Sequence, residues 1–203
     1  MRTKLPLVSL GVALAALTAH VIPGATGFLQ YDREAIAGGE VWRWFSGHLA
    51  HFGANHLAWD VAVFVALGVV CERESRRRVA VALVAAALAI PAALWWWQPQ
   101  FQLYRGLSGL DCALGGLLAA SLMQHREAMP KTAGALTLVF VGAKCAFEVS
   151  TATTLFASGI GYLPVPLTHL VGLALGAMAT LVGKTNFSET IKTDSRPFFH
   201  EHT

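Results

Sequence analysis

Six apolar stretches fill most of this 203-residue chain. They cover residues 5–22, 49–70, 79–97, 107–123, 133–150 and 164–183. A helix needs about 20 apolar residues to cross the hydrocarbon core of a bilayer, so each stretch has a suitable length. Because a helix satisfies its own backbone hydrogen bonds in hydrocarbon, the pattern predicts an all-α membrane protein with a bundle of six transmembrane helices.

The composition also indicates that the chain is surrounded by lipid. Charged residues make up 13% of the chain and apolar residues 55%, whereas a soluble domain has roughly 25% charged residues. The net charge of +3 gives no reason to expect nucleic acid as a partner, and membrane lipid is the expected surrounding. The three cysteines have no paired spacing that would predict a disulfide or a zinc site.

The basic residues predict an orientation. If the N-terminus is cytoplasmic, eleven of the 15 Lys and Arg residues lie in cytoplasmic segments and three lie in outer loops. The positive-inside rule therefore favours a transmembrane domain over residues 1–184 with both termini cytoplasmic, followed by a polar cytoplasmic tail over residues 185–203. Cleavage of the first stretch as a signal peptide is an alternative, but the five remaining helices would break the charge asymmetry.

Polar and ionisable side chains inside the apolar stretches are costly and indicate a functional site. Ser108 begins the fourth predicted helix, and His169 and His56 lie about five and seven residues from the outer ends of theirs, roughly 8–10 Å in depth. We therefore expect these three residues at one level in the outer half of the membrane. The other members of this set are His51, Asn55, Asp60, Asp111, Lys144 and Glu148.

Small residues recur every four positions on the helices that carry Ser108 and His169. Gly116 lies on one, and Gly172 and Gly176 lie on the other. Such stripes let two helix backbones approach closely. A close crossing would bring Ser108 within hydrogen-bond reach of His169, which is what a general base needs in order to activate a hydroxyl nucleophile. The alternative is that the stripe serves packing alone, with each polar side chain bonded to a neighbour.

The position of Ser108 also suits anion stabilisation. It lies in the first turn of its predicted helix, where backbone N–H groups are free and the helix dipole favours negative charge. These groups can form an oxyanion hole, to which His56 can add a side-chain donor. Gly106 and Gly109 would allow the chain to turn and a substrate backbone to come near.

Four motifs in this order resemble those of the rhomboid family of intramembrane serine proteases. Trp42-Arg43 resembles the family's Trp-Arg loop motif, and the segment from His56 to Asp60 resembles its HxxxN helix motif. Residues 106–109 match GxSG, and residues 169–176 match HxxGxxxG. The resemblance covers residues 40–177 and implies a rhomboid-like fold of six transmembrane helices.

The resemblance implies roles for single residues. Ser108 would be the nucleophile and His169 the general base, while His56 and the backbone N–H of Ser108 would hold the oxyanion. Substrates would be single-span membrane proteins that are cut near the outer membrane face. The enzyme would need no metal or cofactor. The residues expected to line a polar cavity or to meet substrate are His51, Asn55, Gly106, Gly109, Trp42 and Arg43.

Asp60 departs from the family, which usually has Asn at this position. An ionised carboxylate would repel an oxyanion, so Asp60 must either be neutral or orient His56 one turn away. A direct part for Asp60 in the oxyanion hole therefore stays open.

Several features resemble the rhombosortase branch of the family. They are a loop of about 25 residues after the first stretch, Lys144 and Glu148 one turn apart, Leu155-Phe156, and Pro164-Val165-Pro166. Rhombosortases process bacterial proteins that carry a Gly-rich C-terminal sorting tail, which implies the bacterial inner membrane as location. A general rhomboid protease with other substrates is the alternative.

The pair of Lys144 and Glu148 is interpreted as a structural ion pair or as a docking point for substrate. Removing one partner would leave a buried charge, at a cost of several kcal/mol. Asp111 is expected to pair with Lys144 instead of completing a catalytic triad.

Two other classes of function are compatible with some of these residues. His48, His51, His56 and Asp60 carry groups that bind zinc or iron, but no HExxH motif supplies a metalloprotease base. A non-proteolytic rhomboid-like scaffold is the second class, although both Ser108 and His169 are present.

Overall fold

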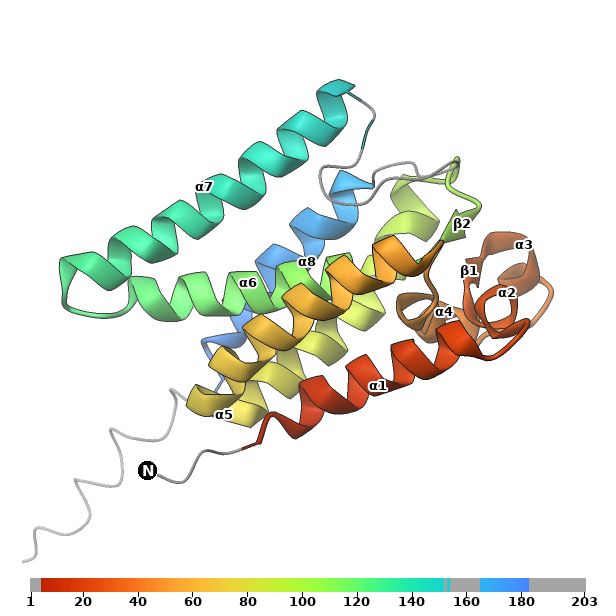
Figure 1. The fold of residues 1–203 in the computed structure, drawn as a ribbon. Helices are drawn as coiled ribbons and strands as arrows, with labels where there is room; N and C mark the ends of the chain where they lie inside the picture. The colour runs from red at the N-terminus through yellow and green to blue at the C-terminus, as the bar shows by residue number, and fades with distance from the viewer. Residues whose placement is uncertain (1–4, 152, 154–164, 183–203) are drawn as a thin grey trace, which may run out of the picture.

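The computed structural model describes residues 5–151, 153 and 165–182, and its fold is mostly helical (Figure 1). The longer helices are α1 (Leu7–Val21), α5 (Ala54–Trp97), α6 (Ser108–Met123), α7 (Ala128–Thr151) and α8 (Pro166–Ala179). Shorter elements join α1 to α5: α2 (Ala25–Leu29), α3 (Arg33–Ala37), α4 (Arg43–Ser46) and the 3-10 helix η1 (Gly47–Leu49). Strand β1 (Tyr31–Asp32) pairs antiparallel with β2 (Leu103–Tyr104).

Each apolar stretch of the sequence contains a helix. Helix α5 comprises two of the predicted helices, which are joined at Ser75, where the backbone is not helical (φ −158°, ψ 103°). The second stretch was predicted to be helical from residue 49, but α5 begins at Ala54 because η1 and a turn occupy its first residues. The predicted tail over residues 185–203 and Leu155-Phe156 lie outside the described residues.

By length and composition, α5 and α7 can cross a membrane. Helices α1, α6 and α8 are apolar but shorter, so the number of spans stays a prediction. Large apolar side chains cover the outside of the bundle, as shown by Leu14, Val84 and Val139, each at least 60% exposed. An apolar surface of this extent is expected of a protein that is surrounded by lipid.

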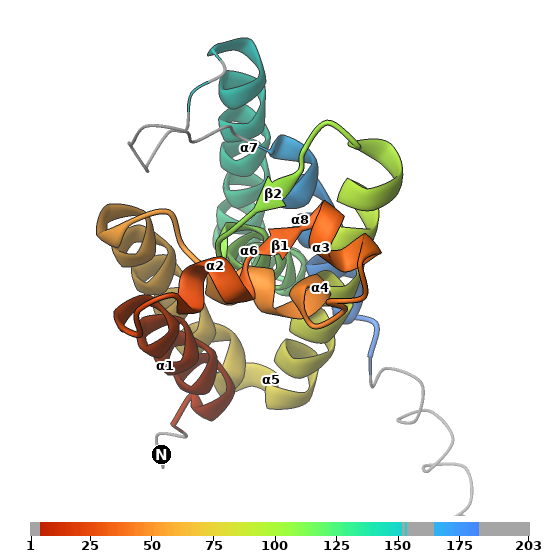
Figure 2. The same ribbon diagram turned by 90° about the vertical axis from the view of Figure 1, so that its right-hand side faces the viewer.

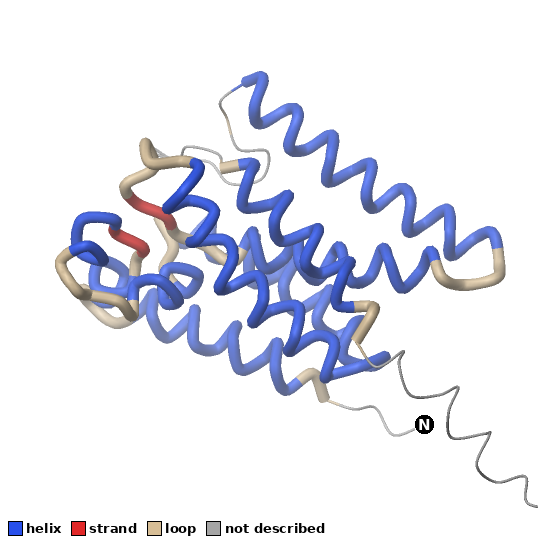
Figure 3. The backbone as a smooth tube through the Cα atoms, turned by 180° about the vertical axis from the view of Figure 1, so that it is seen from behind, coloured by secondary structure: helices blue, strands red, loops and turns tan. Residues whose placement is uncertain are grey.

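Helix α6 lies at the centre of the bundle. It contacts α5, α7 and α8, while α1 packs on α5 (Figures 1 and 2). All residues of α6 from Gly109 to Leu117 are buried. The short helices α2 to α4 and both strands gather at one end of the bundle, beside the start of α6 (Figure 3). Any side chain at the start of α6 is therefore held in the interior near that end.

Helices α6 and α8 cross with their backbones in contact. A Cβ atom added at Gly172 would overlap the carbonyl oxygen of Gly109, and one added at Gly176 would overlap that of Ala113. On the facing helix, a Cβ at Gly116 would overlap the carbonyl oxygen of Leu173. The close crossing that was predicted from the small-residue stripes is confirmed.

A buried carboxylate attaches α1 to α5. Glu72 accepts hydrogen bonds from the backbone N–H and the hydroxyl of Ser9, both at 2.7 Å, and pairs with Arg76 at 3.2 Å. Arg76 also donates to the carbonyl of Leu5. These partners compensate the cost of burying the charge of Glu72.

Arg43 and Trp42 hold together the segment between α1 and α5. The Arg43 guanidinium binds the Glu40 carboxylate at 2.6 Å and donates to the carbonyl oxygens of Gly27 and Gln30. The Trp42 indole donates to the carbonyl of Phe28. This segment in turn contacts the loop before α6, because the backbone N–H of Gly106 donates to the carbonyl of Gly47 at 3.2 Å.

We predict that Gly116→Ala destabilises the protein by about 1–3 kcal/mol, because its methyl group has no room against α8. The neighbouring Gly115→Ala is the matched control, since a Cβ at Gly115 meets no atom within 4 Å. Thermal unfolding of the detergent-solubilised protein measures both. Equal midpoints for the two variants would contradict the close crossing of α6 and α8.

Candidate active site

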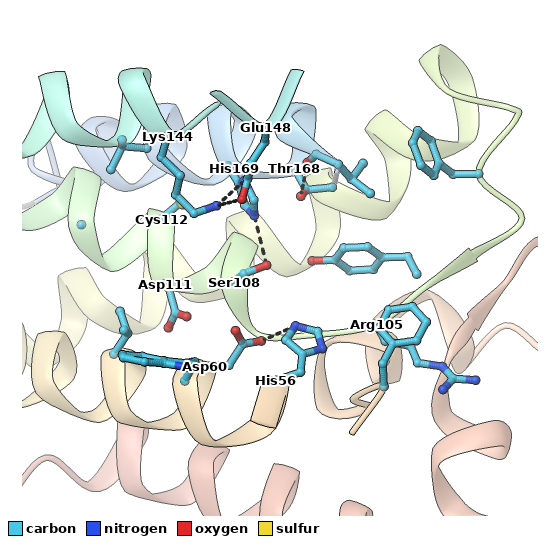
Figure 4. A pocket seen from close by; sticks show the side chains of 18 of the residues that line it. His56, Asp60, Arg105, Ser108, Asp111, Cys112, Lys144, Glu148, Thr168 and His169 are labelled. Carbon is cyan, nitrogen blue, oxygen red and sulfur yellow. Dashed lines mark hydrogen bonds and ion pairs between the residues drawn. The ribbon is translucent and has the colours of Figure 1, made fainter. Parts of the chain in front are cut away.

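Ser108 and His169 lie within hydrogen-bond distance across the α6–α8 crossing. The His169 Nε2 atom is 3.1 Å from the Ser108 Oγ atom (Figure 4). His169 is buried and Ser108 is partly exposed. This arrangement lets an imidazole accept the hydroxyl proton while the oxygen remains reachable.

The loop before Ser108 has a conformation that requires glycine. Gly106 has φ +123°, and a Cβ atom there would lie 2.9 Å from the His56 ring and 3.0 Å from the Asp60 Oδ2 atom. The next residue, Leu107, donates its backbone N–H to the same Asp60 oxygen at 2.8 Å. The turn that was expected at Gly106 is therefore present, and Asp60 fixes it from α5.

Two histidines also face the Asp60 carboxylate. The Nε2 atoms of His51 and His56 each lie 3.2 Å from its Oδ2 atom. An ionised carboxylate only accepts hydrogen bonds, so these potential donors and the N–H of Leu107 suit it better than a neutral carboxyl group. Of the two alternatives for Asp60, the geometry supports the one in which it orients His56.

The other face of His169 meets α7. Its Nδ1 atom is 3.2 Å from the Glu148 Oε2 atom and 3.3 Å from the Lys144 ammonium. The ion pair predicted between Lys144 and Glu148 is present at 2.7 Å. The sequence does not predict the contact of this pair with His169, because no local spacing determines the relative position of α7 and α8.

The expected pairing of Asp111 with Lys144 is wrong. Lys144 pairs with Glu148, and no ion pair within 4 Å joins it to Asp111 in the part of the chain that the structure describes. The Oδ1 atom of Asp111 is buried there without a hydrogen-bond partner. Lys144 and Glu148 are one turn apart on the same helix, whereas Asp111 lies across the cavity on α6.

A cavity of about 540 Å³ leads to Ser108. Side chains of α5, α6, α7 and α8 line it, together with residues 100–105. Trp59 on α5 and Phe140 on α7 line this cavity and are 47% and 54% exposed. The cavity therefore reaches the lipid-facing surface at α5 and α7. Most of its wall is apolar, and the polar groups cluster around Ser108 and His169.

Several residues expected at the cavity do not line it. His51 is 1% exposed and lies behind Asp60, while Asn55 is exposed at the start of α5. The reason is that α5 begins at Ala54, so His51 precedes the helix instead of sharing a face with His56.

The remaining expected residues have structural contacts. Gly109 has no room for a side chain, since a Cβ atom would lie 2.6 Å from Ile90 and 3.2 Å from the Tyr104 hydroxyl. Its small size therefore serves helix packing and not the approach of a substrate. Gly106, Trp42 and Arg43 are likewise absent from the cavity wall, because they shape the loops described above.

Other residues at the cavity were not expected from the sequence. Tyr104 and Arg105 line it directly before Gly106, and Thr168 lines it beside His169. The Arg105 guanidinium lies 4.8 Å over the Phe52 ring and also binds the Gln30 side chain. Their position next to the GxSG and HxxGxxxG motifs was a signal that could have identified them.

Comparison with known proteins identifies a family for this chain. The profile of the Rhomboid domain matches residues 38–185, which include every residue of the site described above. No curated protein matches the chain. The chain therefore belongs to the rhomboid family, whose members are intramembrane serine proteases, and it is an integral membrane protein.

Proposed function

We propose that this protein is an intramembrane serine endopeptidase in which Ser108 is the nucleophile and His169 the general base. The observation that carries the proposal is the 3.1 Å contact between Ser108 Oγ and His169 Nε2 at the end of a cavity. His169 takes the hydroxyl proton as Oγ attacks the peptide carbonyl, and it then gives that proton to the leaving amine. Water then hydrolyses the acyl-enzyme. His169 takes a proton from the water and returns it to the Oγ atom of Ser108.

The oxyanion hole of this mechanism consists of the backbone N–H of Ser108 and the side chain of His56. Ser108 is the first residue of α6, so its N–H has no acceptor within the helix. The neighbouring N–H of Leu107 is already bound to Asp60. Asp60 thus acts indirectly, since it holds the loop of Leu107 and lies against the His56 ring.

The cavity suits a substrate that is itself a membrane helix. Its walls between α5 and α7 are mostly apolar, and the polar groups lie at the end next to Ser108. We propose that single-span membrane proteins enter here and are cut near the outer membrane face, where the helix unwinds. We place both termini in the cytoplasm, in a bacterial inner membrane, because the distribution of Lys and Arg along the chain favours this orientation.

Processing of Gly-rich C-terminal sorting tails, as in rhombosortases, is the finer proposal. It is supported by the sequence features that resemble this branch, in particular Lys144 and Glu148 one turn apart in α7. A general rhomboid protease with other substrates and a non-proteolytic scaffold are the alternatives that the experiments below distinguish.

We predict that a fluorophosphonate probe labels the wild-type protein and that Ser108→Ala and His169→Ala abolish both labelling and cleavage without unfolding the bundle. Cys112→Ala should keep the labelling, although Cys112 lines the same cavity and carries a stronger nucleophile. Gel fluorescence and a cleavage assay provide the measurements. Full activity of either the Ser108 or the His169 variant would overturn the assignment of these two residues. A folded wild-type protein that neither labels nor cleaves would favour the scaffold.

We predict that Asp60→Asn keeps near-normal or higher activity. The amide oxygen of Asn can still accept the N–H of Leu107, and the negative charge near the oxyanion is removed. The ratio kcat/KM of the two proteins measures the effect. A loss of more than about 100-fold, roughly 2.7 kcal/mol, would mean that the charge of Asp60 itself is required.

We predict that co-expression with a single-span protein that carries a Gly-rich C-terminal tail produces a new C-terminus within or next to the tail. Mass spectrometry of the product identifies the cut, and co-expression with the Ser108→Ala variant is the control. A matched substrate without the Gly-rich segment should remain intact. Equal cleavage of both substrates would exclude the sorting-tail specificity and would favour a general rhomboid protease.

A further inference from the structure

The position of Glu148 behind His169 extends the site by one residue. We propose that Glu148 is a positioning residue for His169, so that Ser108, His169 and Glu148 work as a triad in which Lys144 holds the carboxylate. This inference rests on the proposed protease function and names an acidic member that neither the motifs nor the family comparison assigns.

The three side chains form one continuous chain of contacts. Ser108 Oγ is 3.1 Å from His169 Nε2, and His169 Nδ1 is 3.2 Å from Glu148 Oε2. The Glu148 side chain is 1% exposed and that of His169 is 7% exposed. The contacts join α6, α8 and α7, so each member is fixed by a different helix.

The contact with Glu148 selects the tautomer of the imidazole that a base needs. A neutral histidine carries one proton, and the nitrogen without the proton is its acceptor. If Nδ1–H donates to the Glu148 carboxylate, Nε2 is free to accept the proton of Ser108. Without an acceptor at Nδ1, the proton can reside on Nε2, and His169 can then no longer act as the base.

Lys144 competes with Glu148 for the same ring nitrogen. Its ammonium lies 3.3 Å from Nδ1 and can only donate, so it would favour the unproductive tautomer. It also lies 2.7 Å from the Glu148 Oε1 atom, which leaves Oε2 for the histidine. We infer that Lys144 compensates the burial of the carboxylate and fixes its orientation, while the carboxylate determines the state of His169.

The carboxylate also stabilises the imidazolium that forms when His169 takes the proton. The Lys144 ammonium on the same helix opposes this effect at a similar distance. From other helices, the titratable groups of His56, Asp60, Asp111 and Cys112 line the same cavity. Glu148 has the only carboxylate within ion-pair distance of His169 in the described part of the chain.

This geometry distinguishes the proposal from the two roles expected from the sequence. A structural ion pair would need only the contact between Lys144 and Glu148, and a docking site would need only that the pair line the cavity, as both residues do. Neither role requires an oxygen of Glu148 at 3.2 Å from the base.

The test measures the rate of fluorophosphonate labelling of Ser108 as a function of pH, in the full-length protein in detergent. A small probe requires no docking of a membrane helix, so its rate reports on the activation of Ser108. We expect Glu148→Gln to slow labelling by about 100-fold or more at neutral pH. We also expect the acidic limb of its pH profile to move to lower pH, because the imidazolium loses the adjacent negative charge.

Glu72→Gln is the matched control, because Glu72 is also a buried acid on a membrane helix but binds Ser9 and Arg76. It should lower thermal stability and leave the acidic limb unchanged. If Glu148→Gln alone does not fold, the double variant Lys144→Met with Glu148→Gln removes both charges of the pair and should show the same slow labelling.

If the folded Glu148 variants label at the wild-type rate and keep the wild-type acidic limb, this inference is overturned and the proposed function still stands. A folded wild-type protein that does not label would overturn the proposed function and this inference with it. A slower rate with an unmoved acidic limb in Glu148→Gln would assign Glu148 a structural role and would also overturn the proposal. The double variant is judged by its labelling rate alone, because it removes both charges beside the imidazolium.

Discussion

The contact between the backbones of α6 and α8 is the constraint on which the site depends. Gly116, Gly172 and Gly176 leave no room for a Cβ atom at this crossing, so the two helices meet more closely than larger residues would permit. Ser108 and His169 lie one at the start of each helix, and the 3.1 Å distance between them is a consequence of this approach. A methyl group added at one of these glycines would push the helices apart and would lengthen the distance between Ser108 and His169 beyond that of a hydrogen bond.

Buried charges are the second constraint, because water cannot compensate them inside a membrane bundle. Glu72 is satisfied by Ser9 and Arg76, and Asp60 by a backbone N–H and two histidines. Each carboxylate thus connects two segments that are distant in sequence. Asp111 differs, since its Oδ1 atom has no hydrogen-bond partner among the described residues.

The placement of α7 links the fold to its chemistry. This helix packs on α6 and α8, and a cavity of about 540 Å³ lies between it, α5 and the rest of the site. Phe140 and Val141 of α7 belong to the apolar wall of the cavity, and Lys144 and Glu148 further along the same helix reach the ring of His169. One helix therefore serves both as a boundary of the cavity and as the support of the general base.

The sequence by itself determined the helices, the close crossing and the pair of Ser108 and His169, because apolar length, four-residue spacing and short motifs are local properties of the chain. It also predicted the ion pair of Lys144 and Glu148, whose members are one turn apart. Only the tertiary structure decided that Glu148 contacts His169, that Asp111 does not pair with Lys144, and that His51 lies behind Asp60. These facts depend on the rotation and relative position of separate helices, which are fixed by packing over the whole bundle and by no spacing within one segment.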